Sequence, residues 1–245
     1  MRITDGVHRL GTGLVNAYLL ADGGGVTIID AGFPGYWSQL GGELAAMGRT
    51  LEDVRAVVLT HGHSDHLGFA ERARRERHIP VSIHEADALL ARGKVKNPAK
   101  GTGPVRPIPL LRFIGLAMRW GGWHIDRLLE VATFGDGATL DVPGSPRVVL
   151  VPGHTPGSAA LHVADRGILF VGDAFATTAV TTGAVGPRIA PFTADAEAAL
   201  ASLDRLAGLD ARWMLPGHGE PWTDGPEAAI AAVRESSAAA RSDRR

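Results

Sequence analysis

The sequence of 245 residues contains no cysteine. The chain therefore forms no disulfide bond, offers no thiolate to a metal ion and has no cysteine nucleophile. Lysine is nearly as scarce, since only Lys94, Lys96 and Lys100 occur, all in one short stretch. The formal net charge is −1, so the chain lacks the basic excess with which proteins bind nucleic-acid phosphates. We expect no nucleic-acid partner.

Long apolar runs are also missing. No stretch has the length of about 18 apolar residues that indicates a membrane-spanning helix, and residues 1–6 contain no apolar segment of signal-peptide length. The hydrophobic fraction of 45% and the charged fraction of 21% are ordinary for a globular protein. We therefore expect a cytoplasmic protein without a membrane partner. We also expect a single domain over residues 1–245.

Three histidines and an aspartate, in contrast, are crowded into the six residues 61–66. They directly follow the apolar run 56–59, which is predicted to be a buried strand ending in a loop. His61 and His63 are two residues apart, so in an extended segment both rings point to one side. Imidazole and carboxylate groups are the usual ligands of zinc and related first-row metals. The segment therefore predicts a metal site that includes Asp65 and His66.

Three later apolar runs, each predicted to be a buried strand, end in the same kinds of residue. The residues that follow these runs are His154, Asp173 and His218. Glycine and proline around His154 and His218 indicate tight, rigid turns. We predict that all four strand ends, including the end of the run 56–59, converge at one sheet edge.

The rest of the chain alternates apolar runs with helical segments, which indicates an α/β layered domain. A hairpin is predicted around residues 22–25, and helices are predicted over 39–47, 71–77, 85–92, 193–206 and 226–240. Residues 93–130 break the alternation. There a loop rich in Gly, Pro and Lys precedes an apolar helical stretch predicted over 110–129, which also carries Arg112, Arg119 and Arg127.

The pattern His-x-His-x-Asp-His at residues 61–66 resembles the motif of the metallo-β-lactamase superfamily in its two-metal hydrolase form. His154 in His-Thr-Pro-Gly, then Asp173 and His218, match the later motifs of that family in order. The resemblance extends from about residue 7 to residue 220. It implies a four-layer αββα sandwich of two mixed β-sheets flanked by helices. It also implies that the insertion at 93–130 is a helical lid over the site; a packing helix or a homodimer face is the alternative.

Carried over residue by residue, the resemblance implies two divalent metal ions, most simply zinc, with manganese or iron as alternatives. The first ion would be held by His61, His63 and His154, the second by Asp65, His66 and His218, and both by Asp173. A water or hydroxide bridging the ions would be the nucleophile, and Asp65 would act in catalysis by accepting or relaying a proton. Asp30, in an Asp-x-Gly after a predicted strand, would contact the ligands from outside; a plain turn aspartate is the other interpretation.

The expected substrate is a small ester, lactone or thioester with a hydrophobic portion. Its contacts in the insertion would be Phe113, Trp120, Trp123 and His124. Asp173 argues against β-lactam hydrolysis as the main role, since known metallo-β-lactamases generally lack this bridging aspartate. Ala176 stands where many acyl-homoserine lactonases carry a tyrosine, and the region after His218 lacks the lysines with which glyoxalase II-like enzymes bind glutathione. β-Lactam or phosphodiester hydrolysis, and persulfide oxidation at a single iron, are the alternatives.

Overall fold

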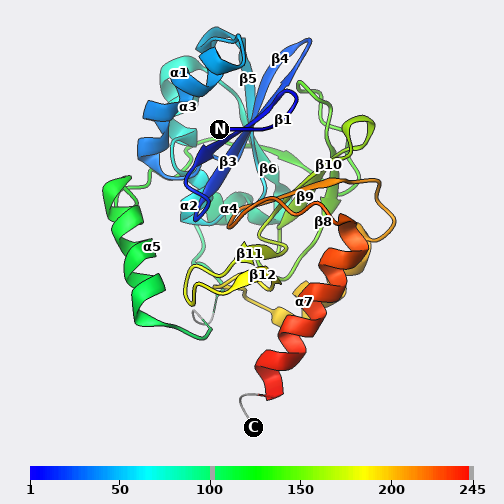
Figure 1. Ribbon diagram of the computed structural model, residues 1–245. Coiled ribbons are helices and arrows are strands. Elements are labelled where there is room, and N and C mark those ends of the chain that lie inside the picture. Colours follow the sequence, from blue (N-terminus) through cyan, green and yellow to red (C-terminus); the bar gives the residue numbers. More distant parts are fainter. Residues whose placement is uncertain (100–102, 243–245) are drawn as a thin grey trace.

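The computed structural model describes residues 1–99 and 103–242. Two β-sheets lie face to face in its centre, and helices cover their outer sides (Figure 1). Within these residues the first sheet has seven strands in the order β1-β2-β3-β4-β5-β6-β7. Their bounds are Arg2–Thr4, Val7–Gly11, Asn16–Asp22, Gly25–Ile29, Val54–Leu59, Val81–His84 and Ala132–Phe134. Neighbouring strands are antiparallel from β1 to β4 and parallel from β4 to β7.

The second sheet, in the same described residues, has four strands in the order β13-β10-β9-β8. Their bounds are Trp213–Pro216, Ile168–Gly172, Ala159–Val163 and Arg147–Leu150. β10 is parallel to β13 and antiparallel to β9, which is antiparallel to β8. A small hairpin of β11 (Ala176–Thr178) and β12 (Val185–Arg188) follows β10. Both main sheets are therefore mixed, as the resemblance implied.

Helices cover the outer face of each sheet. On the first sheet lie α1 (Trp37–Ala46), α3 (Ala70–Arg77) and α5 (Pro107–Arg119), and on the second lie α6 (Ala196–Ser202) and α7 (Gly225–Ser242). The short helices α2 (Ser64–Leu67) and α4 (Ala88–Ala91) follow β5 and β6. Single 3₁₀ turns occur at Pro34–Tyr36, Leu51–Asp53, Glu85–Asp87, Ala164–Arg166 and Leu203–Leu206.

Alternation along the strands builds a core in three layers. Successive strand residues point to opposite faces, so Leu19 of β3 packs towards α1 while Leu20 packs between the two sheets. In β10, Phe170 lies between the sheets and Leu169 packs towards α6 and α7. The order helix, sheet, sheet, helix is the predicted αββα sandwich.

The prediction of a helix over 110–129 is wrong at both ends. α5 begins at Pro107, because proline suits the first helical turn. It ends at Arg119, where the backbone N–H of Gly122 donates to Ala117 and that of Gly121 donates to Met118. Gly121 has a φ of 77°, the left-handed conformation that closes a helix in this way.

Other boundaries differ less. The segment predicted as a helix over 85–92 is a 3₁₀ turn followed by the short helix α4. The strands β1, β2, β7, β11 and β12 had no predicted counterpart, since each has five residues or fewer and no long apolar run. Residues 100–102 of the predicted lid, with Lys100, lie outside the described residues.

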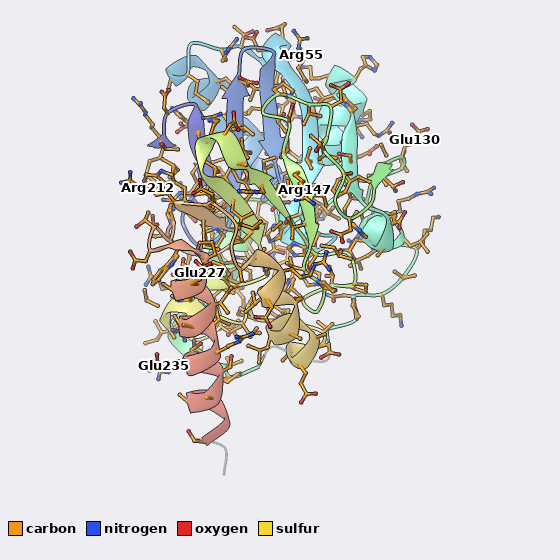
Figure 2. The ribbon with its side chains drawn as sticks, turned by 90° about the vertical axis from the view of Figure 1, so that its right-hand side faces the viewer. Arg55, Glu130, Arg147, Arg212, Glu227 and Glu235 are labelled. Carbon is orange, nitrogen blue, oxygen red and sulfur yellow. The ribbon has the colours of Figure 1, made fainter. Side chains whose placement is uncertain are left out.

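The surface over the second sheet carries charged side chains of both signs. Figure 2 shows Arg147 and Arg212 on this side, and Glu227 and Glu235 along α7. Among the described residues, no helix combines the length and the apolar character needed to cross a membrane.

Candidate metal centre

The predicted metal ligands follow the carboxyl ends of strands from both sheets. β5 of the first sheet leads into His61 and His63, and the single turn of α2 carries Asp65 and His66. The second sheet contributes His154 after β8, Asp173 after β10 and His218 after β13. The prediction of one shared sheet edge is therefore wrong: the side chains meet where the edges of two facing sheets come together.

These side chains form groups close enough to share a metal ion. The nitrogen and oxygen atoms within each group lie within 4.8 Å of one another. The groups are His61, His63 and His154; His61, His66 and Asp173; and Asp65, His66 and His218. Two of these groups coincide with the two ligand sets that the resemblance implied. All the members are buried except Asp65, which is partly exposed.

Asp173 lies between the two sets. Its Oδ2 atom is 3.3 Å from Nε2 of His154 and 3.1 Å from Nε2 of His218, and its Oδ1 atom is 3.6 Å from Nε2 of His66. Nε2 of His218 is also 3.5 Å from Oδ2 of Asp65. The Asp173 carboxylate therefore contacts one histidine of the first set and two of the second.

Each of the five imidazoles has one ring nitrogen within hydrogen-bond distance of an oxygen outside the cluster. These contacts are His61 Nδ1 to Thr60 Oγ1, His63 Nε2 to Asn97 Oδ1, His66 Nδ1 to Asp30 Oδ2, His154 Nδ1 to Thr193 Oγ1 and His218 Nδ1 to the Leu14 carbonyl. The hydroxyls of Thr60 and Thr193 donate elsewhere, so they accept from the rings. A neutral ring that donates through one nitrogen keeps a lone pair on the other. The second nitrogen of each ring faces inward, as in metal-binding histidines, and can bind a metal ion when it carries no proton.

The inward-facing atoms fit a bound cation. Nε2 of His61, Nε2 of His66 and Oδ1 of Asp173 are buried and have no hydrogen-bond partner among the described residues. Nδ1 of His63 lies 2.8 Å from Nε2 of His154, and two lone pairs at that distance repel unless a proton or cation lies beside them. Buried polar atoms are rarely left without a partner. Imidazole with carboxylate is the donor set that zinc, iron and manganese accept.

Asp30 accepts three hydrogen bonds at the edge of this cluster. Its Oδ2 accepts from His66 Nδ1 and from the Thr60 hydroxyl, and its Oδ1 accepts from the Thr60 backbone N–H, each at 2.8 Å. Its φ of 60° lies in the left-handed region, which aspartate adopts more readily than most residues. The carboxylate thereby orients His66 directly and His61 through Thr60.

The neighbouring carboxylates set the protonation of the cluster. Burial disfavours a charged ring at His66, but Asp30 and Asp173 together raise its pKa to about 10. Burial and the adjacent rings hold the pKa of His61 well below its usual range. A metal ion at the inward-facing nitrogens would compete with the proton on His66, because a ring must be deprotonated to bind metal.

Sequence patterns did not single out Asp87, which joins the two histidine-bearing loops. It is fully buried. Its Oδ2 accepts from the Gly62 N–H and the Thr155 hydroxyl, and its Oδ1 accepts from the Gly157 N–H, each at 2.7 Å. Gly62 belongs to the loop after β5, and the other two belong to the loop that carries His154. The only signal in the sequence was an acidic residue just after a strand, and the helical pattern of 85–92 obscured it.

A pocket of about 280 Å³ adjoins the metal-binding cluster. Its lining is polar at His63, Ser64, Asp65 and Asn97, and apolar at Phe33, Phe113, Ile114, Ala117, Gly122, Trp123 and Phe192. Phe192 has a φ of 63°, a strained conformation for an aromatic residue, and it precedes the threonine that contacts His154. An apolar pocket with a few polar groups on one side is typical of a small-molecule site.

The four predicted pocket residues separate into two pairs. Phe113 and Trp123 line the pocket. Trp120 instead packs edge-on against Tyr36 at 5.3 Å between ring centroids, as part of the core under α5. His124 is exposed and is not among the lining residues in the described part of the chain. The substrate contacts predicted at Trp120 and His124 therefore differ from the observed lining.

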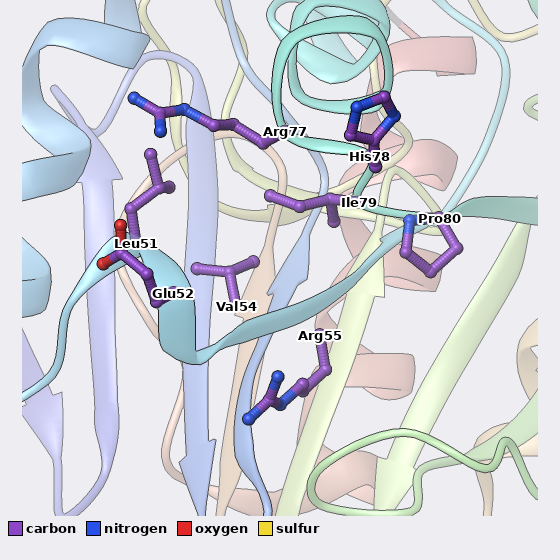
Figure 3. Close-up of a pocket in the computed structure, with 8 residues that line it drawn as sticks. All are labelled: Leu51, Glu52, Val54, Arg55, Arg77, His78, Ile79 and Pro80. Atoms are coloured by element: carbon purple, nitrogen blue, oxygen red, sulfur yellow. The ribbon is translucent and has the colours of Figure 1, made fainter.

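A larger hollow, of about 420 Å³, lies at the opposite end of the first sheet (Figure 3). Val54 at the start of β5 and Pro80 before β6 form part of its wall, with Arg55 and Arg77 beside them. Ligands of parallel sheets bind outside the carboxyl ends of the strands. This hollow is at the amino ends, so the smaller pocket beside the histidines is the candidate active site.

Comparison with known proteins identifies the family. A family model described as the metallo-β-lactamase superfamily matches residues 10–218, which include all the ligand-type residues described above. The chain belongs to the metallo-β-lactamase superfamily. The predicted resemblance is therefore confirmed.

Individual relatives of this superfamily member align with most of its length. The probable metallo-hydrolase YflN of Bacillus subtilis is 30% identical over 231 residues, covering 89% of this chain and 85% of YflN. The metallo-β-lactamase family protein TTHA1429 from Thermus thermophilus has a TM-score of 0.68 and 25% identity, over 95% of this chain and 80% of that one. TTHA1623, solved in a di-iron-bound form, has a TM-score of 0.63 and 30% identity, over 91% of this chain and 96% of that one.

In this superfamily member, replacing Asp30 with asparagine should weaken metal binding by about ten- to a hundredfold, the usual effect of altering a ligand's outer partner. Asparagine keeps the size and tolerates the left-handed φ, but its single acceptor oxygen cannot serve three donors. Competition with a chromogenic chelator measures the affinity. Asp224 is exposed, so Asp224→Asn is the matched control, and equal affinities in the two variants would contradict the role of Asp30.

Replacing Asp87 with alanine should lower the free energy of unfolding by about 3 kcal/mol or more. Three buried donors lose their acceptor, and an unpaired buried polar group costs about 1–3 kcal/mol. Denaturant unfolding in the presence of a chelator measures the loss without a contribution from metal. Asp165 is exposed, so Asp165→Ala is the control; an unchanged midpoint in Asp87→Ala would show that the loops do not depend on this carboxylate.

Proposed function

We propose that this superfamily member is a dinuclear metal-dependent hydrolase that acts on a small ester, lactone or thioester with an apolar portion. The observation that carries the proposal is the ring of inward-facing imidazole nitrogens around Asp173, beside a pocket with an apolar wall. The cluster supports metal-dependent hydrolysis, and the pocket supports the class of substrate.

Two of the three close groups of side chains support a division into two ligand sets. We assign His61, His63 and His154 to one ion, Asp65, His66 and His218 to the other, and Asp173 to both. Two bound divalent cations supply Lewis acidity and lower the pKa of a bound water towards neutrality. The outer hydrogen bonds of the five rings fix which nitrogen is free, so the ligand geometry exists before the ions bind.

Asp65 is suited to move the proton. It lines the pocket, and its Oδ2 lies 3.5 Å from Nε2 of His218. Unlike the other members of the cluster it is partly exposed, so it can exchange a proton with solvent. We therefore assign Asp65 as the acceptor of the proton that the attacking water loses.

The pocket lining favours a compact apolar substrate. A volume of about 280 Å³ lies just below the usual range for ligand pockets, which begins near about 300 Å³. Phe33, Phe113 and Phe192 provide apolar surface opposite the polar residues. Among the described residues, no arginine or lysine lines the pocket. A phosphodiester would therefore gain no ion pair there, which favours an acyl or aryl group beside the scissile bond.

Acid release from a substrate panel tests the proposal. Lactones, thioesters, aryl esters, β-lactams and phosphodiesters should be offered to zinc-loaded and iron-loaded protein, with a chelated sample as control. We expect chelator-sensitive turnover of an ester, lactone or thioester. Turnover of β-lactams alone, or of phosphodiesters alone, would show that the proposed ester, lactone or thioester class is wrong. Oxygen uptake with a persulfide, at one iron per chain, would overturn the hydrolase assignment.

Iron is a second candidate for the native metal. The 30% identical relative TTHA1623 was solved in a di-iron-bound form, whereas the donor set of the cluster suits zinc equally well. Elemental analysis of protein expressed without added metal should find two ions per chain. One ion per chain would contradict the dinuclear assignment.

Replacing Trp123 with alanine should raise KM about tenfold for substrates with long apolar groups and leave it nearly unchanged for short ones. Trp123 lines the pocket and is 68% exposed, so its loss removes substrate contact without opening the core. Trp120→Ala is the control on the same segment, and it should lower the melting temperature because Trp120 packs on Tyr36. Equal effects of Trp123→Ala on short and long substrates would remove Trp123 from the binding surface.

A further inference from the structure

Exposed apolar side chains are concentrated in one segment of this protein. Ten large apolar side chains are exposed in the described part of the chain, and eight of them fall between residues 89 and 129. The eight are Leu89, Val95, Val105, Ile108, Leu111, Met118, Trp123 and Leu129. Apolar side chains exposed singly are ordinary, but a concentration of this kind indicates an interaction surface.

Helix α5 at the centre of this segment is apolar on both sides. Phe113 and Leu116 pack against the core under the first sheet. A surface helix is normally polar on its other side, yet here Ile108, Leu111 and Met118 are 73%, 65% and 59% exposed. Figure 1 shows α5 at the periphery of the described structure, on the side away from α7.

The charged residues of α5 are both basic. Arg112 and Arg119 are exposed, and each comes one position after an exposed apolar residue, Leu111 or Met118. We define the α5 face as Ile108, Leu111, Arg112, Met118 and Arg119. Among the described residues, the ion pairs that involve arginine are made by arginines outside α5. Residues 92–127 contain eight lysines and arginines and one acidic residue, in a chain of net charge −1. The segment is thus strongly basic while the chain as a whole is not.

The α5 face is continuous with the pocket. Ile114 lines the pocket, and Leu111 and Met118 are three residues before it and four after it, so they lie beside it on the helix surface. Trp123 both lines the pocket and is exposed. Apolar surface therefore extends from the solvent side of α5 to the entrance of the candidate active site.

We propose that the α5 face binds the surface of an anionic lipid bilayer. Helices that lie in a membrane interface combine aliphatic residues and tryptophan with arginine or lysine, and α5 contains no acidic residue. Two α5 faces packed together would oppose like charges, which makes a second copy of this chain the weaker partner. Our expectation of no membrane partner rested on the lack of spanning segments, which such a helix does not need.

Bound in this way, the protein holds its pocket entrance at the lipid surface, where an amphiphilic substrate would be concentrated. This step extends the proposed function by naming an amphiphile as the substrate class. The binding itself needs no turnover. A vesicle measurement and a hydrolysis assay can therefore fail independently.

Co-sedimentation of the full-length, metal-loaded protein with vesicles tests the binding. Vesicles of phosphatidylglycerol and phosphatidylcholine in equal parts should retain the protein at least about tenfold better than vesicles of phosphatidylcholine alone, since each basic residue at an anionic surface contributes about a fivefold gain. High salt should weaken the retention. Equal retention on both vesicle types, or none, overturns the proposal.

Variants locate the contact. Leu111→Glu with Met118→Glu should abolish retention, and the exposure of both side chains leaves the core intact; circular dichroism checks the fold. The matched control is Ala231→Glu with Ala238→Glu, at exposed positions of α7, the helix that carries Glu227 and Glu235 (Figure 2). Retention should survive in this control.

A charge-only variant keeps the test independent of the apolar substitutions. Arg112→Gln with Arg119→Gln should lower retention on anionic vesicles about tenfold or more. Unchanged retention in both α5 variants would contradict the proposal. A dimer in sedimentation velocity that Leu111→Glu with Met118→Glu dissociates, without retention on vesicles, would assign the α5 face to a second copy instead.

Discussion

Replacing Asp173 with alanine should remove at least one metal ion per chain and lower kcat/KM by about a thousandfold or more, which corresponds to about 4 kcal/mol of transition-state stabilisation. The carboxylate contacts His154 in one ligand set and His66 and His218 in the other. Without this carboxylate, buried imidazoles from both sets lose the negative charge that they share. Two bound cations would then repel each other with no carboxylate between them. Elemental analysis and steady-state kinetics on the same preparation measure both effects.

Asp173→Asn separates the charge of this residue from its shape. Asparagine has one acceptor oxygen, so it can serve only one of the two sets. We expect about one ion per chain and partial activity. Asp141 is exposed, and Asp141→Ala is the control for a lost surface carboxylate. Two ions per chain with unchanged turnover in Asp173→Ala would show that the shared-ligand assignment is wrong.

Removing the metal should lower the melting temperature by about 10 °C or more. A ligand present at a thousand times its Kd stabilises the folded chain by about 4 kcal/mol, and 1 kcal/mol shifts the melting temperature of a chain of this size by about 2–4 °C. His61 and His66 come from the first sheet, whereas His154 and His218 come from the second. Ions held by these residues would thus connect the two sheets. Thermal unfolding with chelator, and after zinc or iron is restored, measures the shift.

The rise in melting temperature on adding metal should depend on pH in a defined direction. In the metal-free protein, Asp30 and Asp173 raise the pKa of His66 to about 10 against the effect of burial, so its ring is protonated at neutral pH. Metal uptake displaces that proton, and the gain in melting temperature on adding metal should therefore shrink as the pH falls. Asp173→Ala should show a smaller gain than the unaltered protein at every pH. A gain that grows towards low pH would contradict the competition between metal and proton.

The sequence was sufficient for the parts of this site that are local. His61, His63, Asp65 and His66 lie within six residues, directly after an apolar run, so their proximity follows from chain geometry alone. Continuous apolar runs identified most of the longer strands, because these strands bury both of their faces. Together with the motif order, these patterns were enough for the fold class.

The sequence did not reveal the contacts that cross between loops. Asp87 reaches Gly62 across 25 residues, and Asn97 reaches His63 across 34. Such hydrogen bonds leave no periodic signal, since they depend on where distant segments come to lie after folding. Phe33 and Phe192 were missed on the pocket wall for the same reason.

Helical pattern also could not distinguish the two tryptophans of the insertion. Trp120 and Trp123 are three residues apart and both aromatic, but the turn closed by Gly121 sends one ring into the core against Tyr36 and leaves the other at the pocket. The sequence by itself determined which chemical groups the site contains and their order along the chain. Only the tertiary structure decided that they meet between two sheets, which ring nitrogens face inward and which side chains line the pocket, because those properties arise from packing between segments distant in the sequence.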